Sequence, residues 1–195
     1  MSKRKERNTK GKIITAAWKL FYELGYDETT VDEIIEESGT SKGSFYHYFD
    51  GKDALLSSLS ELFDAKYSEL AETMDRSANA FELLMFLNRE LFAMVESTVS
   101  LELLARLYSS QLITKGERHL LDQERVYYKL LRQIVVQGQQ RGELRDDVPA
   151  NEVVKTYALC ERALLYDWCI CNGQYSLREY SQKMMPKFML DYKTQ

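Results

Sequence analysis

Hydrophobic residues recur every three or four positions along most of the chain, which is the period of an amphipathic α-helix. In the first such segment Ile13, Ala17, Leu20 and Leu24 fall on one stripe, and Gly25 follows as a helix stop. The pattern therefore predicts a first helix at about 9–24. No segment alternates convincingly between polar and apolar residues, as a half-buried β-strand would.

Two short helices are predicted next. Thr30 stands three positions before Glu33, a capping box in which each side chain satisfies the other residue's backbone N–H. The second helix begins there and should end at Ser38, because Gly39 can take the left-handed conformation of a helix exit. Residues 39–41 form a turn of the length that joins the two helices of a DNA-binding helix-turn-helix. The third helix is predicted at about 42–48.

The third helix has two contrasting faces. At 100° per residue, Phe45, Tyr48 and Phe49 form its buried stripe, with only the hydroxyl of Tyr48 reaching out. Gly43 and His47 point the opposite way. A glycine on the exposed face of so short a helix costs about 1 kcal/mol relative to alanine. We therefore expect another molecule to approach its backbone closely.

Longer helices are predicted over the rest of the chain. Asp50 and Asp53 mark the start of a fourth helix that reaches about residue 75. Lys52 lies in its first turn, where the helix dipole disfavours a cation, and a nearby phosphate would account for it. Further helices are expected near 79–97, 100–113, 118–141, 150–172 and 176–190, which gives about nine in total.

The last two predicted helices carry surplus hydrophobic surface. The helix at 150–172 is apolar nearly all round, so it must be buried on two sides, and the helix at 176–190 has an apolar stripe. This surplus predicts a homodimer in which the two helices pair with their copies as a four-helix interface. The candidate interface residues are Val154, Leu165, Trp168, Leu177, Tyr180, Met184 and Phe188.

Composition agrees with an all-α fold. The chain has only two prolines and nine glycines in 195 residues, and helix formers are plentiful. The length allows one compact body with a small appended module. We expect an N-terminal three-helix domain with a helix-turn-helix at 1–51, followed by a C-terminal helical bundle at 52–195 that dimerises.

The charge distribution leaves room for a small basic surface. A net charge of −4 by itself argues against nucleic acid. Residues 1–52, however, hold nine Lys or Arg and nine Asp or Glu residues, so the net negative charge lies in the rest of the chain. Lys3, Arg4 and Lys5 belong to a basic N-terminal arm. This arm could contact DNA, or it could equally be a disordered, solubilising tail.

Neither a signal peptide nor a membrane span is recognisable, because the first residues are basic and no apolar run is long enough. The sequence therefore predicts a cytoplasmic protein without a membrane partner. The three cysteines Cys160, Cys169 and Cys171 fall in one predicted helix, so they cannot pair within the chain. Buried, reduced thiols are the simpler interpretation.

The sequence offers no catalytic constellation. Residues 39–43 match the G-x-S-x-G pattern of the hydrolase nucleophile elbow, but that elbow requires a preceding strand, and here a helix precedes. Only two histidines exist, His47 and His119, and no metal-ligand spacing or phosphate-binding glycine loop is present. We therefore predict that the chain is not an enzyme and needs no metal or cofactor.

The segment "AAWKLFYELGYDETTVDEIIEESGTSKGSFYHYFDGKDALL" resembles the N-terminal domain of the TetR/AcrR family of transcriptional regulators. The positions that carry the resemblance are Gly25-Tyr26, Thr29-Thr30-Val31, Ile34, Gly39, Lys52 and the run from Ser41 to Phe49. Together with its flanks, this segment covers about a quarter of the chain. The C-terminal part follows the family only in outline.

This resemblance implies a regulator, most simply a repressor, whose third helix enters the major groove of double-stranded DNA. It also implies a dimer on a palindromic operator and a small-molecule effector that tilts the fourth helix to release the DNA. On physical grounds, Lys42, Ser44, Tyr46 and His47 can donate to phosphates and base edges. The full set of candidate DNA-binding residues is Lys3, Arg4, Lys5, Thr30, Ser41, Lys42, Gly43, Ser44, Tyr46, His47, Tyr48 and Lys52.

Aromatic residues of the C-terminal part could line an effector pocket, although ordinary core packing explains each of them singly. Glu161, inside an apolar helix, could meet a cationic ligand or form a salt bridge. The candidate pocket residues are Phe63, Tyr67, Phe86, Phe92, Tyr108, Tyr127, Tyr128, Tyr157 and Glu161. The alternative function is a protein-interaction module that uses the helix-turn-helix as a scaffold without binding an operator.

Overall fold

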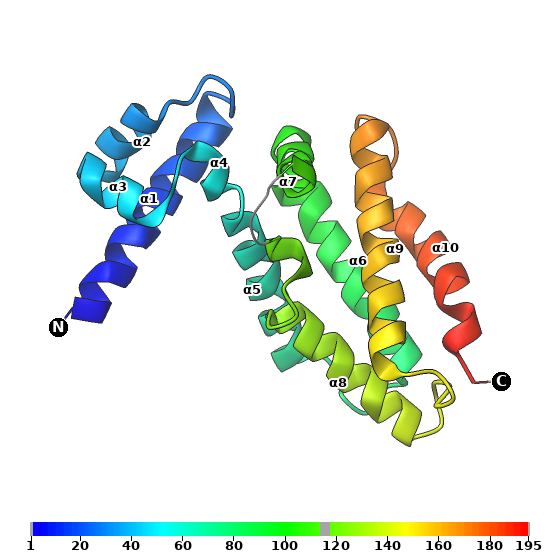
Figure 1. The fold of residues 1–195 in the computed structure, drawn as a ribbon. Coiled ribbons are helices and arrows are strands. Elements are labelled where there is room, and N and C mark those ends of the chain that lie inside the picture. Colours follow the sequence, from blue (N-terminus) through cyan, green and yellow to red (C-terminus); the bar gives the residue numbers. More distant parts are fainter. Residues whose placement is uncertain (1, 114–117, 195) are drawn as a thin grey trace.

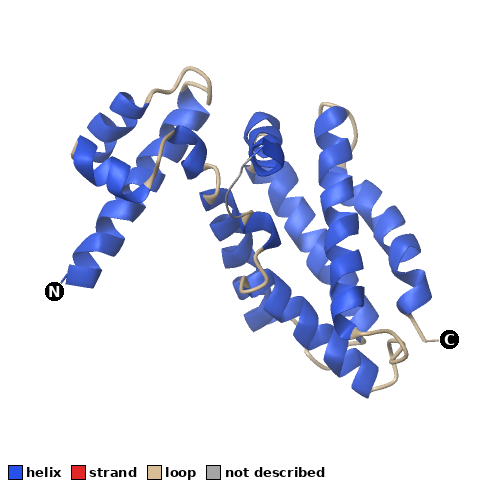
Figure 2. Cartoon of the chain, in the orientation of Figure 1, coloured by secondary structure: helices blue, strands red, loops and turns tan. Residues whose placement is uncertain are grey.

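The protein is all-helical in the computed structural model, which describes residues 2–113 and 118–194, with side chains from residue 9 onward. Figures 1 and 2 show a small N-terminal domain beside a larger C-terminal bundle. The helices are α1 Ser2–Glu23, α2 Val31–Ser38, α3 Lys42–Tyr48, α4 Lys52–Leu55, α5 Ser58–Thr73, α6 Ala80–Thr98, α7 Leu101–Ile113, α8 Val126–Gln140, α9 Ala150–Ile170 and α10 Leu177–Met189, with 3₁₀ turns η1 His119–Leu121 and η2 Leu190–Tyr192.

The predicted helix-turn-helix is confirmed in detail. Thr30 caps α2, and its side chain and that of Glu33 form the reciprocal capping box. Gly39 ends the helix with φ of +62°, a conformation that a side chain would strain. Helices α1, α2 and α3 pack together around Phe45 and Ile34, which are fully buried.

The predicted fourth helix is wrong as a single element. The chain breaks at residues 56–57, between α4 and α5, where tight backbone bonds such as Leu59 N to Leu56 O replace α-helical ones. The hydroxyls of Ser57 and Ser58 donate to the carbonyls of Ala54 and Leu55, at 2.7 and 2.6 Å. Serine side chains compete in this way for the backbone groups of a helix.

Two helix starts also differ from the prediction. Helix α1 begins at Ser2 rather than near residue 9, since no glycine or proline interrupts its basic first turns. Helix α8 begins at Val126 rather than near 118. In the turn that precedes α8, the Asp122 carboxylate accepts a hydrogen bond from the Glu124 backbone N–H at 2.9 Å.

The C-terminal bundle is formed by α5 to α10. Helix α10 packs against α6 and α9, and α8 packs against α5, α6 and α9. The contact between α6 and α8 is close because Gly138 faces Ala80, where a Cβ atom at position 138 would lie only 2.4 Å from the Ala80 Cβ. Within the described residues, no helix is both long enough and apolar enough to cross a bilayer.

Specific contacts join the two domains. The indole Nε1 of Trp18 on α1 donates to the Ser58 hydroxyl on α5 at 2.8 Å. Arg106 on α7 pairs with Asp27 in the α1–α2 loop, and its guanidinium lies 5.4 Å from the centroid of the Tyr26 ring. The orientation of the N-terminal domain is therefore tied to both α5 and α7.

Candidate DNA-binding surface and effector pocket

Helix α3 presents the face that the sequence predicts. Phe45 and Phe49 are buried in the core of the domain, whereas Gly43, Tyr46 and His47 are exposed on the other side. Tyr46 is 47% exposed, so its ring and hydroxyl are accessible from solvent. The short helix thus holds three residues ready for contact with another molecule.

The candidates around α3 are positioned by capping and packing. Ser41 is the N-cap of α3, and its hydroxyl accepts a hydrogen bond from the Ser44 backbone at 3.1 Å. Tyr48 is half-buried and packs against the core, as the helical wheel predicts. Lys42 is exposed and forms an ion pair with Asp32 at 3.3 Å, so DNA would have to compete with an acidic side chain for it.

Lys52 forms hydrogen bonds within the N-terminal domain. Its ammonium donates to the carbonyl oxygens of Tyr26, Asp27 and Thr29 at 2.7, 3.1 and 2.9 Å. These three carbonyls account for a lysine in the first turn of a helix, so the expected phosphate is not needed to explain it. The exposed Thr30 is similarly committed to the capping box. Lys3, Arg4 and Lys5 lie outside the residues whose side chains are described.

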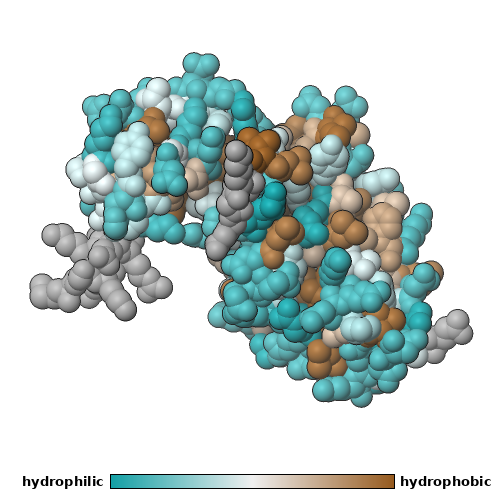
Figure 3. Space-filling view, in the orientation of Figure 1, coloured by the Kyte–Doolittle hydropathy of each residue, from teal (hydrophilic) through white to brown (hydrophobic). Residues whose placement is uncertain are grey.

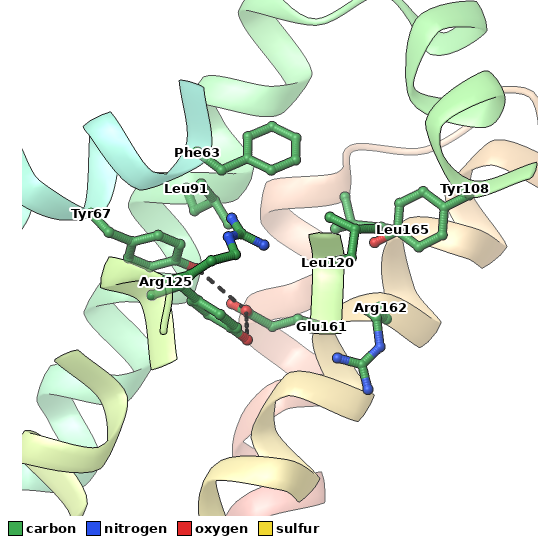
Figure 4. A pocket seen from close by; sticks show the side chains of 10 residues that line it. Phe63, Tyr67, Leu91, Tyr108, Leu120, Arg125, Glu161, Arg162 and Leu165 are labelled. Carbon is green, nitrogen blue, oxygen red and sulfur yellow. Dashed lines mark hydrogen bonds between the residues drawn. The ribbon is translucent and has the colours of Figure 1, made fainter. Parts of the chain in front are cut away.

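A pocket opens in the C-terminal bundle between α5, α6, α7, α8 and α9 (Figure 4). The free space between its walls is about 40 Å³, which is room for water but not for an organic effector. A larger ligand must therefore push the walls apart. The lining residues are Phe63, Tyr67, Leu91, Tyr108, Leu120, Arg125, Tyr127, Glu161, Arg162 and Leu165.

Glu161 is the polar centre of this pocket and is only 4% exposed. Its carboxylate accepts hydrogen bonds from Tyr127 at 2.7 Å, Tyr67 at 3.3 Å and the Asn88 amide at 2.9 Å. Burial raises the pKa of the Glu161 carboxyl, and these donors oppose that rise. The carboxyl group thus joins side chains of α5, α6, α8 and α9.

Five of the predicted pocket residues line the cavity, namely Phe63, Tyr67, Tyr108, Tyr127 and Glu161. The other four do not line this cavity and pack beside it or in the core. Phe92 is a core residue, and Tyr157 is buried with its hydroxyl on the Leu84 carbonyl. Phe86 lies beneath the Arg89 guanidinium, and the Tyr128 hydroxyl bonds the Leu120 carbonyl.

Sequence reasoning missed Leu91, Leu120, Arg125, Arg162 and Leu165 as lining residues. Arg125 is anchored by Asp64, which accepts two hydrogen bonds from its guanidinium at 3.0 Å. The one sequence signal for Arg162 is its place next to Glu161 in a helix that is otherwise mostly apolar. Leu165 was predicted at the dimer interface and instead faces the pocket.

The predicted dimer residues divide into two groups. Val154, Leu165, Trp168 and Leu177 are buried within the single chain, so they have no surface to offer a second copy and this part of the prediction is wrong. Trp168 also donates from Nε1 to the Tyr175 carbonyl at 2.9 Å. Tyr180 and Phe188 are exposed on α10, and Met184 is partly buried.

Helix α9 has an exposed hydrophobic stripe that was not predicted. Leu159, Tyr166 and Ile170 share one helix face and are 57%, 51% and 64% exposed. Figure 3 shows hydrophobic patches on the face that α9 turns to the viewer. The helix is buried on two sides by its own chain, against α7, α8 and α10, and its third side is open.

A sequence model of bacterial regulatory proteins of the tetR family matches residues 13–59, which contain α2, α3 and α4 and the second half of α1. This part of the chain is therefore similar to the tetR family of bacterial regulatory proteins. An uncharacterised helix-turn-helix regulator of Lactococcus lactis is 52% identical over 46 residues, 24% of each chain. In this and other short matches, the chain spans only about a quarter of the length of the curated relatives.

Two further relatives match this chain beyond its N-terminal domain. The fatty acid metabolism regulator protein of Bacillus subtilis is 27% identical over 138 residues, covering 69% of this chain and 70% of that protein. The structure of Thermus thermophilus FadR, a TetR-family repressor in complex with lauroyl-CoA, has a TM-score of 0.78 at 24% identity and covers 92% of both chains. The fold prediction is thereby confirmed, and the names of these relatives agree with the prediction of a regulator rather than an enzyme.

Proposed function

We propose that this chain is a transcriptional repressor that binds a palindromic operator as a homodimer and leaves it when a small-molecule effector binds. The observation that carries the proposal is the exposed face of α3. There Gly43, Tyr46 and His47 face solvent while Phe45 and Phe49 fix the opposite side in the core. A helix anchored in this way can enter the major groove as a rigid reader of base edges.

The DNA-binding unit is residues 1–51 in this proposal. Tyr46, His47 and Ser44 contact base edges and phosphates, and Gly43 allows the DNA backbone to approach closely. Lys42 breaks its ion pair with Asp32 and binds a DNA phosphate instead. The N-terminal arm adds cationic contacts. Since residues 1–52 hold nine Lys or Arg and nine Asp or Glu residues, the affinity for DNA depends on a narrow contact made twice by a dimer rather than on a broad basic surface.

The dimer is built from the open face of α9 and the exposed residues of α10. Leu159, Tyr166 and Ile170 on α9, with Tyr180 and Phe188 on α10, supply the apolar surface that a stable interface requires. Such an isologous contact would hold two recognition helices at a fixed separation, roughly 34–36 Å or a multiple of it for adjacent half-sites.

Effector release would begin in the pocket of the C-terminal bundle. Because the free space is small, an effector must spread Phe63 and Tyr67 on α5 away from Glu161 on α9. Helix α5 leads through the break at 56–57 to α4 and the DNA-binding domain, so its movement would change the spacing of the recognition helices. The complex of Thermus thermophilus FadR with lauroyl-CoA supports an effector with a hydrophobic chain.

The proposal is tested by selecting bound sequences from a random duplex library with the purified full chain. We expect enrichment of an inverted repeat that the protein retards far more strongly than a scrambled duplex at the same salt concentration. Equal, weak retardation of both duplexes would reject operator binding. It would favour the alternative, a protein-interaction module.

A further inference from the structure

Among the described residues, three charged side chains line the pocket, and they differ in whether they already have partners for hydrogen bonds or ion pairs. They are Glu161, Arg125 and Arg162. Glu161 is matched by hydrogen bonds, since Tyr67 and Tyr127 donate to one carboxylate oxygen and Asn88 to the other. Burial also raises the pKa of this carboxyl, which favours its neutral form. A cationic ligand would therefore have to displace these donors to gain a charged partner.

Arg125 already has a carboxylate as its counter-charge. Its guanidinium donates twice to the Asp64 carboxylate, both times at 3.0 Å, and once to the Ser60 carbonyl at 3.1 Å. The positive charge of Arg125 is thus neutralised by a carboxylate in bidentate geometry, the strongest arrangement for this pair of groups.

Arg162 has no such counter-charge. Its guanidinium donates to the Tyr128 hydroxyl at 3.3 Å, and the ion pairs found among the described residues do not include it. The side chain lines the pocket and is only partly exposed. A partly buried guanidinium with one neutral acceptor keeps several N–H donors and a full charge for another partner.

The pocket wall near Arg162 combines a hydrogen-bond donor with apolar side chains, as the binding of an amphiphile requires. Figure 4 shows Arg162 and Arg125 on opposite sides of Glu161, with Tyr108 beside Leu165. Burial raises the pKa of the Tyr108 hydroxyl and the nearby charge of Arg162 opposes that rise, so the phenol stays protonated and can donate. Phe63, Leu91 and Leu165 form the apolar part of the lining.

We propose that the pocket takes an amphiphilic anion, whose carboxylate or phosphate group binds Arg162 and Tyr108 while its hydrocarbon part packs against Phe63, Leu91 and Leu165. This inference rests on the proposed function, in which the pocket is the effector site. The anionic group supplies the counter-charge that Arg162 lacks. Burial of the hydrocarbon part supplies the free energy that is needed to open the small cavity.

The experiment is isothermal titration of the full chain at neutral pH with four compounds that share one eight-carbon chain. Octanoate and octyl phosphate are the two anionic probes and distinguish a carboxylate from a phosphate. Octylammonium is the cationic probe, and 1-octanol is the neutral one. We expect one or both anions to bind roughly tenfold or more tightly than 1-octanol and octylammonium, the range of a charge-assisted hydrogen bond.

Arg162→Gln is expected to reduce binding of the preferred anion to the level of 1-octanol. Arg132→Gln is the matched control, because Arg132 on α8 binds Asn151 and Gln123 and does not line the pocket; it should bind as wild type does. Tyr108→Phe removes one hydroxyl and should weaken anion binding several-fold. It serves as the second variant if Arg162→Gln does not fold.

Tighter binding of octylammonium, equal binding of all four compounds, an unchanged Arg162→Gln variant, or no binding of any octyl compound would each overturn the inference. Operator retardation is measured on the same samples. Specific DNA binding without anion binding would reject the ligand class alone, whereas anion binding without specific DNA binding would reject the proposed repressor and leave the ligand chemistry standing.

Discussion

The ammonium nitrogen of Lys52 lies 2.7 Å from the backbone carbonyl oxygen of Tyr26 and 4.6 Å from the centroid of the same residue's ring. Lys52 thus holds the α1–α2 loop against the start of α4. The hydroxyl of Tyr26 donates to Asp53 one position further along, so the two segments are joined twice.

Lys52→Met should destabilise the protein. The substitution removes the charged donor of three carbonyl oxygens, and we expect a loss of about 2 kcal/mol in the free energy of unfolding. Urea denaturation followed by circular dichroism measures this loss. An unchanged unfolding midpoint combined with weaker, less salt-dependent DNA binding would show instead that Lys52 serves as a phosphate contact.

Gly43→Ala separates folding from DNA binding. An added Cβ meets no atom within 4 Å in the protein, and alanine is the better helix former by about 1 kcal/mol. The variant should therefore melt at a higher temperature and yet bind operator more weakly, because the Cβ occupies space that the DNA backbone needs.

Gly11→Ala is the matched control for this variant, since Gly11 is an exposed glycine of α1 with equally open surroundings. It should stabilise the protein and leave operator affinity unchanged. Wild-type affinity of Gly43→Ala for the operator would contradict the proposed close approach of DNA to α3.

The stability of the wild-type protein should fall with rising pH in a way that Glu161→Gln abolishes. Burial raises the pKa of the Glu161 carboxyl above its ordinary value of 4.5. A group with a raised pKa in the folded state contributes stability below its unfolded pKa, and this contribution is lost as pH rises through the folded pKa.

We therefore expect the free energy of unfolding of Glu161→Gln, relative to wild type, to increase from about pH 4.5 upward and then level off. Urea denaturation at a series of pH values measures the difference. A difference that is constant across this range would show that the Glu161 carboxyl titrates in the folded protein as it does in water.

The double variant Tyr166→Glu with Ile170→Glu should be monomeric. Both side chains lie on the open face of α9 and are more than half exposed in the single chain, so the charges would oppose dimerisation without disturbing the core. Sedimentation velocity measures the outcome. Leu112→Glu, on the exposed side of α7, is the control and should remain dimeric. Persistent dimers of the double variant would place the interface elsewhere.

Local signals allowed the N-terminal domain to be predicted. The capping box of Thr30 and Glu33, the exit at Gly39 and the alternation of Phe45 with Tyr46 each depend on neighbours within four residues, and each was found as predicted. The role of Lys52 could not be predicted, because its partners lie 23 to 26 positions away, in a loop whose position depends on the packing of α1 against α2.

For the C-terminal bundle, sequence patterns predicted that residues are buried but not which neighbours bury them. The apolar character of α9 correctly indicated burial on two sides, but it could not tell which sides its own chain covers. Trp168 is therefore an internal residue, whereas Tyr166 and Ile170 face outward. Likewise Glu161 was recognised as a pocket residue, while Arg125 was overlooked because its role depends on Asp64 of another helix.

Operator recognition by α3 is measured as the ratio of dissociation constants for the selected operator and a scrambled duplex, determined by fluorescence anisotropy at one salt concentration. Wild type and His119→Ala, which changes the only other histidine, should favour the operator by about a thousandfold or more. Tyr46→Ala with His47→Ala should lose most of this preference while remaining folded and dimeric. A wild-type ratio near one, or an unchanged ratio in the double variant, would contradict sequence-specific DNA binding by the exposed face of α3.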